Sequence, residues 1–238
     1  MKISLLAFIT LLACSPTTIP AKTATALERG LLAAGFYCAN KRIRYLENKI
    51  RPMWFEERVL DVTFEGFWDI DTDLGRLFAS ALRRAGLRAM HVDAALSGGS
   101  LSANEVGGSI CAVAGQGTTG EPSDALDPFW DEMRRSSVTY VAYWCAGPYV
   151  VSVTGGAATL GMSGVWRFFD VARGRVVYSQ SAGLAPGVHY KKSMREIEQY
   201  DMIELRRATE RALMATVPDA IRLSLGRKRP ERVGFVRK

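Results

Sequence analysis

Three aspartates stand at alternate positions, Asp69, Asp71 and Asp73, and carboxylates are the ligands that calcium prefers. An EF-hand loop counted from Asp69 needs glycine at its sixth position and glutamate at its twelfth, where this chain has Leu74 and Ser80. Helix capping explains the run better, because a carboxylate accepts hydrogen bonds from the free N–H groups at a helix start. We therefore expect Asp71 to cap a helix, Asp73 to lie in its first turn, and no metal to bind.

The two histidines, His91 and His189, and the cysteines are the side chains best suited to nucleophilic catalysis. No HExxH, GxSxG or cysteine–histidine signature surrounds either histidine, although a fold could bring one beside a cysteine. Asp61 and Glu65 could add acid–base chemistry near the aspartate run, but strand ends and helix caps account for such residues. The sequence predicts no catalytic residue and no cofactor, and it favours a protein that is not an enzyme.

Four tryptophans could line a groove for a glycan or a peptide. They are Trp68, Trp130, Trp144 and Trp166. Aromatic residues beside strands more often fill a core, and we expect these four to do so. The alternative is a ligand-binding or hydrolytic protein with an aromatic and acidic cleft around Trp68 and Asp69.

Hydrophobic periodicity places helices and strands around these residues. Helices are expected at 24–34, 41–49, 74–85, 128–135 and 202–216, with Gly86 stopping the third and Pro218 opening a last turn or kink after the fifth. Strands are expected at 58–64, 87–92, 137–146, 149–154, 164–171 and 175–181. A turn with Gly174 in a left-handed conformation joins the last two. Residues 97–120, rich in glycine and serine, predict a long surface loop with a short strand around 110–113.

These elements define an α/β or α+β fold. We expect a mixed β-sheet with a strand–helix–strand unit, a β-meander and covering helices. The sheet and helices should form one domain over residues 24–226, after a signal at 1–13 and a tether at 14–23, and before a basic tail at 227–238.

The N-terminus has the plan of an export signal. Lys2 precedes the uncharged run 3–13, which is shorter than the roughly 20 residues that a membrane-spanning helix needs. Residues 15–20, with two prolines and several hydroxyl groups, indicate a tether. Ordinary cleavage at Ala24-Thr25-Ala26 is the competing interpretation.

The end of that run, Leu11-Leu12-Ala13-Cys14, resembles the lipobox of bacterial lipoproteins. The resemblance implies cleavage before Cys14 and attachment of acyl chains such as palmitate, which would make this cysteine a membrane anchor. Leu12 is bulkier than usual at its position, and a signal of this length is short for the class. Ser15 in second position is similar to lipoproteins sorted to the outer membrane, facing the periplasm. The alternative location is a soluble periplasmic or secreted protein.

Charge is concentrated at the C-terminus. The chain carries +7, and residues 222–238 hold seven basic residues and one acidic residue. The part from Cys14 to residue 221 is therefore neutral, a pattern that argues against a nucleic-acid surface. The basic tail could bind an anionic lipid, an acidic protein or a wall polymer. Its basic residues are Arg227, Lys228, Arg229, Arg232, Arg237 and Lys238. A solvated tail that keeps the protein soluble is the other interpretation.

Three cysteines remain beyond the anchor: Cys38, Cys111 and Cys145. An oxidising compartment allows a disulfide between two of them, and the sequence leaves all three pairings open.

The lipobox, the helix containing Leu74-Gly75-Arg76-Leu77 and the hairpin around residues 169–179 together resemble periplasmic lipoproteins of the curli-secretion and penicillin-binding-protein-activator type. This resemblance implies a non-enzymatic assembly or regulatory role in the cell envelope, exercised through a protein partner or a homo-oligomer. A third function is an oligomeric envelope secretion component that places the uncharged hairpins of residues 136–166 in the membrane.

Overall fold

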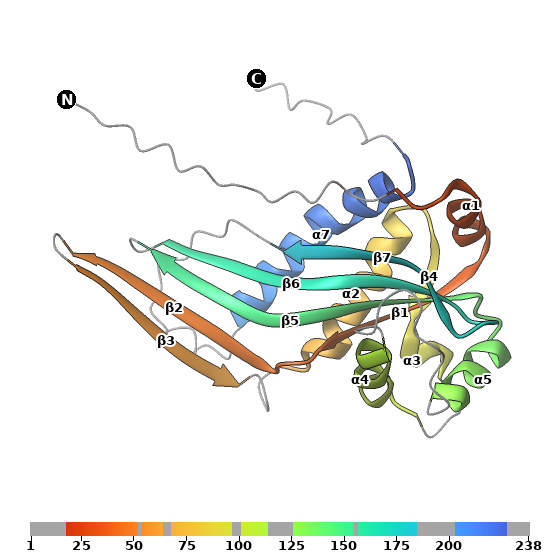
Figure 1. The fold of residues 1–238 in the computed structure, drawn as a ribbon, viewed down its shortest axis with the longest axis horizontal. Coiled ribbons are helices and arrows are strands. Elements are labelled where there is room, and N and C mark those ends of the chain that lie inside the picture. Colours follow the sequence, from red (N-terminus) through yellow and green to blue (C-terminus); the bar gives the residue numbers. More distant parts are fainter. Residues whose placement is uncertain are drawn as a thin grey trace.

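The computed structural model describes residues 18–51, 54–63, 68–96, 101–113, 126–154, 157–184 and 203–227. In these residues a seven-stranded mixed sheet lies between two layers of helices (Figure 1). This arrangement is the α+β class that the sequence predicts. The helices are α1 (Ala21–Arg29), α2 (Ile70–Arg84), α3 (Val92–Ala95), α4 (Ala103–Val113), α5 (Asp127–Arg135) and α7 (Ile203–Ser224). The strands are β1 (Leu31–Cys38), β2 (Arg42–Arg51), β3 (Trp54–Thr63), β4 (Arg88–His91), β5 (Tyr140–Thr154), β6 (Ala157–Asp170) and β7 (Arg175–Leu184).

The sheet is organised around β5, whose 15 residues span about 50 Å. Strand β6 pairs with it along its whole length on one side. On the other side β1 pairs with residues 140–146 and β2 with residues 149–154, both in parallel. Strands β1 and β2 therefore act as one long strand that is interrupted at residues 39–41, level with a bulge in β5 between Ala146 and Tyr149.

The two halves of the sheet have different edges. Strand β4 runs parallel to β1 at one end of the sheet, and β3 runs antiparallel to β2 at the other. Strands β2 and β3 extend beyond the helices, to the left in Figure 1, together with the far ends of β5 and β6. We call β2, β3, residues 150–154 and residues 157–161 the arm.

The core has two compartments, one on each face of the sheet. Helices α2 and α7 cover the face that carries Phe36, Trp144 and Trp166, and the Phe78 and Trp144 rings meet at 5.9 Å. Helices α3, α4 and α5 cover the opposite face, which carries Val141, Tyr143 and Phe169. Burial of each large side chain stabilises the fold by roughly 1.5–3 kcal/mol.

All four tryptophans lie in these compartments, and each is at most 6% exposed. The core interpretation is confirmed, and these residues do not line an aromatic cleft.

Several predicted elements are confirmed. Helix α2 ends just before Gly86, which takes a φ of +92°, and α5 lies where the sequence places it. The β-meander is confirmed as β5–β6–β7, but the strands expected at 137–146 and 149–154 form the single strand β5, and β6 begins at Ala157 and not at 164. Gly174 adopts the left-handed turn with a φ of +60°.

Other predictions are wrong. The helix expected at 24–34 is α1 followed by β1, and the helix expected at 41–49 is β2. Strand β1 is buried on both faces, so its apolar residues show no strand alternation, and pairing with two neighbours overrides the local periodicity of β2. The expected loop at 97–120 contains α4 within its described residues, and α7 continues through Pro218. The predicted strand–helix–strand unit is also paired differently, because β4 joins β1 and not the strand that immediately precedes α2.

The ordered domain begins before residue 24. Ile19 is buried, its N–H donates to the carbonyl of Ser224 at 2.7 Å, and α1 starts at Ala21. Ile19 and the first turn of α1, which the sequence assigns to a tether, thus belong to the domain. At the other end Arg227 donates to the Ala85 carbonyl at 2.8 Å and to Glu28 at 2.7 Å.

The close approach of Tyr143 to β1 gives the first testable prediction. A Cβ at Gly35 would lie 2.4 Å from the Tyr143 ring, whereas one at Gly183 in β7 would meet only a carbonyl at 3.7 Å. We expect Gly35→Ala to lower the free energy of unfolding by roughly 1–3 kcal/mol, as overpacked sites do. The matched Gly183→Ala variant should unfold within about 0.5 kcal/mol of the parent. Urea unfolding of the three proteins checks this, and equal stability of both variants would contradict the packing described here.

Candidate functional site

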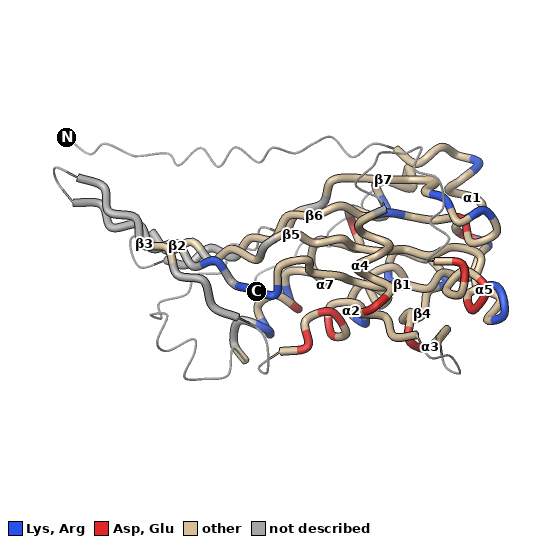
Figure 2. The backbone as a smooth tube through the Cα atoms, turned by 60° about the horizontal axis from the view of Figure 1, so that its bottom comes forward, with Lys and Arg blue, Asp and Glu red and all other residues tan. Residues whose placement is uncertain are grey.

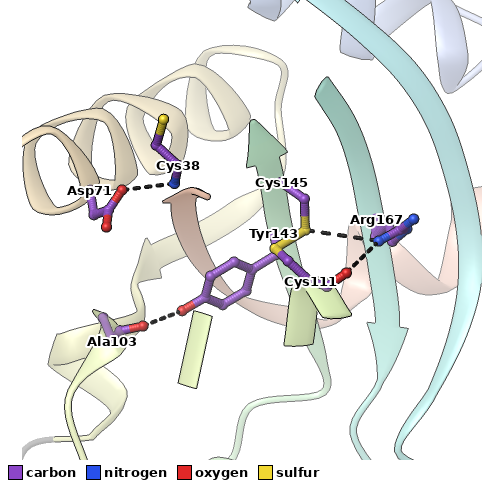
Figure 3. Close-up of a disulfide and its surroundings, with 7 residues drawn as sticks. All are labelled: Cys38, Asp71, Ala103, Cys111, Tyr143, Cys145 and Arg167. Carbon is purple, nitrogen blue, oxygen red and sulfur yellow. Dashed lines mark hydrogen bonds between the residues drawn. A yellow bond between two sulfur atoms is a disulfide. The ribbon is translucent and has the colours of Figure 1, made fainter. Parts of the chain in front are cut away.

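A buried carboxylate, that of Asp71, lies at the interruption between β1 and β2. Strand β4 ends opposite Ala34, so among the described residues the later part of β1 has no strand on that side. The start of α2 fills the space, and the carboxylate of Asp71 accepts the Cys38 N–H at 2.9 Å (Figure 3). The second carboxylate oxygen of Asp71 lies 3.3 Å from the Lys41 ammonium. We call Cys38, Lys41 and Asp71 the junction.

Asp71 does not cap the helix as the sequence predicts. Asp69 is the N-cap, since its side chain accepts the Thr72 N–H at 3.3 Å. Asp71 lies in the first turn and faces inward, 2% exposed. The positive end of α2 favours its charge there.

Burial raises the pKa of Asp71, while the Cys38 N–H and the Lys41 ammonium act in the opposite direction. Lys41 is itself half exposed, so its charge stays solvated while it contacts the buried carboxylate. The junction is therefore a compensated buried charge that fixes the direction in which the chain enters β2.

The thiol of Cys38 is not a nucleophile in this setting. Its Sγ donates to the Asn40 carbonyl at 3.1 Å and lies 3.6 Å from the Gly147 carbonyl. Burial raises the pKa of Cys38 to about 11, so almost none of it is thiolate at neutral pH. The junction holds backbone together and does not supply a reactive sulfur.

The other two cysteines form a disulfide that ties α4 to β5. Arg167 of β6 lies beside it and donates to the Cys111 carbonyl at 3.4 Å (Figure 3). Burial lowers the pKa of this arginine, whose guanidinium stays charged at neutral pH. On the same face the Tyr143 hydroxyl donates to the Ala103 carbonyl at 3.0 Å, a second contact that holds α4 on the sheet.

His91 has a structural position at the end of β4. Its Nδ1 accepts the Asp93 N–H at 3.4 Å and so caps α3, and burial lowers its pKa. A Cβ at Gly75 would lie 2.6 Å from His91 Nε2, so this glycine lets α2 lie against the histidine. No hydrogen bond joins His91 to a cysteine within the described residues, and His189 lies outside them.

The three aspartates of the sequence motif do not share a partner. Asp69 caps α2, and Asp71 accepts a hydrogen bond from the Cys38 N–H. Asp73 accepts a hydrogen bond from Trp68 Nε1 at 3.0 Å and forms an ion pair with Arg206 at 2.6 Å. Within the part of the chain that the structure describes, no group of three His, Cys, Asp or Glu residues could hold a metal. In the same part, no helix is long and apolar enough to cross a membrane.

The structure places the remaining predicted site residues apart from the junction. Arg227 packs against α1 and α2, and Lys228, Arg229, Arg232, Arg237, Lys238 and Cys14 lie outside the described residues. The role of Asp71 at the junction was missed, although a signal existed. Asp71 lies three and seven residues before Leu74 and Phe78, on the stripe of α2 that faces the core.

No protein-family model matches this sequence, and no curated protein matches it. Solved structures with a similar arrangement include the PelC dodecamer from Paraburkholderia phytofirmans, at 11% identity and a TM-score of 0.38, over 90% of this chain and 96% of that one. The lipoprotein GNA1162 from Neisseria meningitidis matches at 11% identity and a TM-score of 0.33, over 76% and 98% of the two chains. The LpoB C-terminal domain from Salmonella enterica matches at 13% identity and a TM-score of 0.25, over 68% and 93%. No residue role is transferred from these proteins.

Two substitutions at Asp71 separate its hydrogen bond from its charge. Asp71→Ala leaves the Cys38 N–H buried without an acceptor and should lower the free energy of unfolding by about 1–3 kcal/mol. Asp71→Asn keeps an acceptor oxygen, and at pH 7 its stability should stay within about 1 kcal/mol of the parent. Equal stability of the alanine and asparagine variants would contradict this role.

The same residue gives a pH dependence. Because the pKa of Asp71 is higher in the folded protein than its ordinary value of 3.8, the folded state binds the proton more tightly. Its contribution to stability therefore falls as pH rises from 3.8 through the raised pKa. The difference in unfolding free energy between Asp71→Asn and the parent, measured by urea unfolding across this range, should shift in favour of the asparagine variant as pH rises. A difference that does not change with pH would contradict the raised pKa.

The disulfide is expected to stabilise the attachment of α4. Its cysteines are 34 residues apart, and a cross-link over such a loop stabilises by about 2–4 kcal/mol. The double variant Cys111→Ser/Cys145→Ser should lose this amount in urea unfolding. A reductant should lower the stability of the parent by the same amount as the double substitution does, and it should leave the stability of the double variant unchanged. A parent protein that is insensitive to the reductant would show that the bond contributes nothing.

Proposed function

We propose that this protein is a lipid-anchored component of the bacterial envelope that works through protein contacts, in a non-enzymatic assembly or regulatory role. The feature that carries the proposal is the arm, which extends the sheet beyond its helical layers. Strand β2 pairs with both β3 and β5, and within the described residues neither β2 nor β3 has an extensive contact with a helix.

The arm has the properties of a surface that meets another protein. In the described sheet, β3 is an outermost strand, so one side of its backbone has no strand partner. Val59, near the middle of β3, is 53% exposed, the largest value for a bulky apolar residue in the described part. Backbone groups on such an edge can pair with a strand of a partner or of a second copy.

The anchor rests on the sequence Leu11-Leu12-Ala13-Cys14 and on the tether that follows it. Acyl chains on Cys14 would hold the domain at the outer membrane on the periplasmic side. The junction supports the role indirectly, because it joins the arm to the domain through a buried contact and not through a loose linker.

An oligomeric secretion component is the second proposal, favoured by the same edge. A second copy that pairs with β3 would extend the sheet from one subunit to the next. The uncharged stretch 136–166 begins just after α5 and includes β5 and part of β6, and its buried residues Trp144 and Trp166 lie against α2.

The anchor is tested by metabolic labelling with a fatty-acid analogue. The parent should incorporate the label, and Cys14→Ser should not. Cys38→Ser serves as the matched control, because this buried thiol is not expected to be acylated. Labelling of Cys14→Ser at the parent level would overturn the anchor.

The arm is tested by a photo-cross-linking amino acid placed at Val59, with Ala172 in the β6–β7 turn as the control. Both positions are exposed. In intact cells we expect adducts of defined mass from Val59 and none from Ala172. An adduct of twice the chain mass indicates a second copy, and another mass indicates a different partner. No adduct from Val59, or equal adducts from both positions, would contradict a contact surface on the arm.

A further inference from the structure

We propose that the end of the domain opposite the arm is a membrane-facing surface that binds anionic phospholipid headgroups. This inference rests on the proposed anchor at Cys14. The surface comprises α1, the last turn of α2, the first residue of β4, and the stretch from Asp219 to Arg227 at the end of α7. We call it the basic end.

The connection between the proposed anchor and the domain is short. Ile19 is fixed by its buried side chain and by its hydrogen bond to Ser224. From Cys14 to Thr18 there are four residue steps, which cover at most about 14 Å even when fully extended. A lipid on Cys14 would therefore hold Thr18 within about 14 Å of the headgroup layer.

Both termini leave the domain at this place. Thr18 lies beside Gly226, since a Cβ on that glycine would be 3.9 Å from Thr18 Cγ2. Figure 1 shows the start of α1 and the end of α7 side by side. In the sequence, the basic residues from Lys228 to Lys238 follow directly after Arg227, and Cys14 precedes Thr18 by four residues.

The basic end carries a strong positive charge. Its acidic residues are Glu28, paired with Arg227, and Asp219, paired with Arg222. Its basic residues are Lys22, Arg29, Arg83, Arg84, Arg88, Arg222 and Arg227, which gives a net charge of +5. Figure 2 shows the basic residues of α1 at the end of the molecule away from the arm.

Structural roles account for only part of this charge. Arg83 donates to the Ala89 carbonyl at 2.9 Å, and Arg222 donates to the Arg84 carbonyl at 2.5 Å, both near helix ends that favour positive charge. Four other basic residues are exposed and have no acidic partner within the described residues: Lys22, Arg29, Arg84 and Arg88. Lys22 even lies in the first turn of α1, where a positive charge is unfavourable.

Distance and charge together favour a lipid surface as the partner. The distance of about 14 Å is the upper limit for an extended connection, so the basic end can approach to less than the Debye length of about 8 Å at physiological ionic strength, where the field of the headgroup layer acts on it. Each basic residue near an anionic leaflet strengthens binding by about fivefold. Since β1 starts beside α1 and runs towards β2, a domain resting on its basic end directs the arm away from the membrane.

The test measures vesicle binding of the full chain carrying Cys14→Ser, so that no acyl chain contributes. Vesicles contain phosphatidylglycerol and phosphatidylcholine, or phosphatidylcholine alone. The variant Lys22→Gln/Arg84→Gln/Arg88→Gln should bind anionic vesicles at least about tenfold more weakly than its parent. The control Arg76→Gln/Arg207→Gln/Arg211→Gln removes the same charge from exposed positions elsewhere on α2 and α7. Its affinity for anionic vesicles should fall by less than about twofold.

The outcomes separate the two proposals. An equal loss of affinity for anionic vesicles in the two variants would overturn the basic end as a lipid surface. A parent that shows no preference for anionic vesicles would overturn it as well, and would leave an acidic protein as the partner of this surface. Binding through the uncharged residues 3–13 is measured on the vesicles of phosphatidylcholine alone and is subtracted before the variants are compared. If labelling shows no acylation of Cys14 but the variants behave as expected, the anchor fails while the headgroup surface stands.

Discussion

The hydrogen bond from the Cys38 N–H to the buried carboxylate of Asp71 is the contact on which the shape of this protein depends. The chain leaves β1 at Cys38, crosses three residues and continues as β2 along the same neighbour, β5. An interruption inside a sheet exposes backbone groups, and a buried one must satisfy them. The helix that follows the β2–β3 hairpin returns to the interruption and supplies the missing acceptor.

A buried carboxylate is tolerated here because three favourable effects coincide: a backbone N–H donor, the nearby Lys41 ammonium and the start of α2. Gly75 one turn later lets the helix lie close to β1 and His91. The arm thus continues the sheet, and it projects from the end opposite the one where the chain enters and leaves the domain. The two ends suit the two parts of the proposed function, with the anchor and basic residues at one end and a protein-contact surface at the other.

The sequence predicts well those elements whose signals are local. Helix α2 has an apolar stripe through Leu74, Phe78 and Leu82 and a glycine stop, and the β6–β7 hairpin has its turn glycine. Strands β1 and β2 were mistaken for helices because their identity comes from partners far along the chain.

The same distinction between local signals and contacts far along the chain applies to the site residues. The core role of the tryptophans could be inferred from residue type, since large aromatic rings beside strands are usually buried. The inward position of Asp71 could be inferred from its spacing to Leu74 and Phe78, but its partner could not, because the strand that it faces is known only from the fold. The tether could not be delimited either, since the burial of Ile19 depends on α7, which lies at the other end of the sequence.

The most direct test of the account is the height of the two ends above a membrane. The acylated protein would carry a fluorophore at Ala21→Cys in α1 or at Val59→Cys in the arm, where the buried, high-pKa Cys38 thiol does not compete for the label. Energy transfer to acceptors on lipid headgroups should be strong from Ala21 and weak from Val59, because β5 alone spans about 50 Å between the two ends. Equal transfer from both positions, or stronger transfer from Val59, would contradict a domain that stands on its basic end with the arm directed away from the membrane.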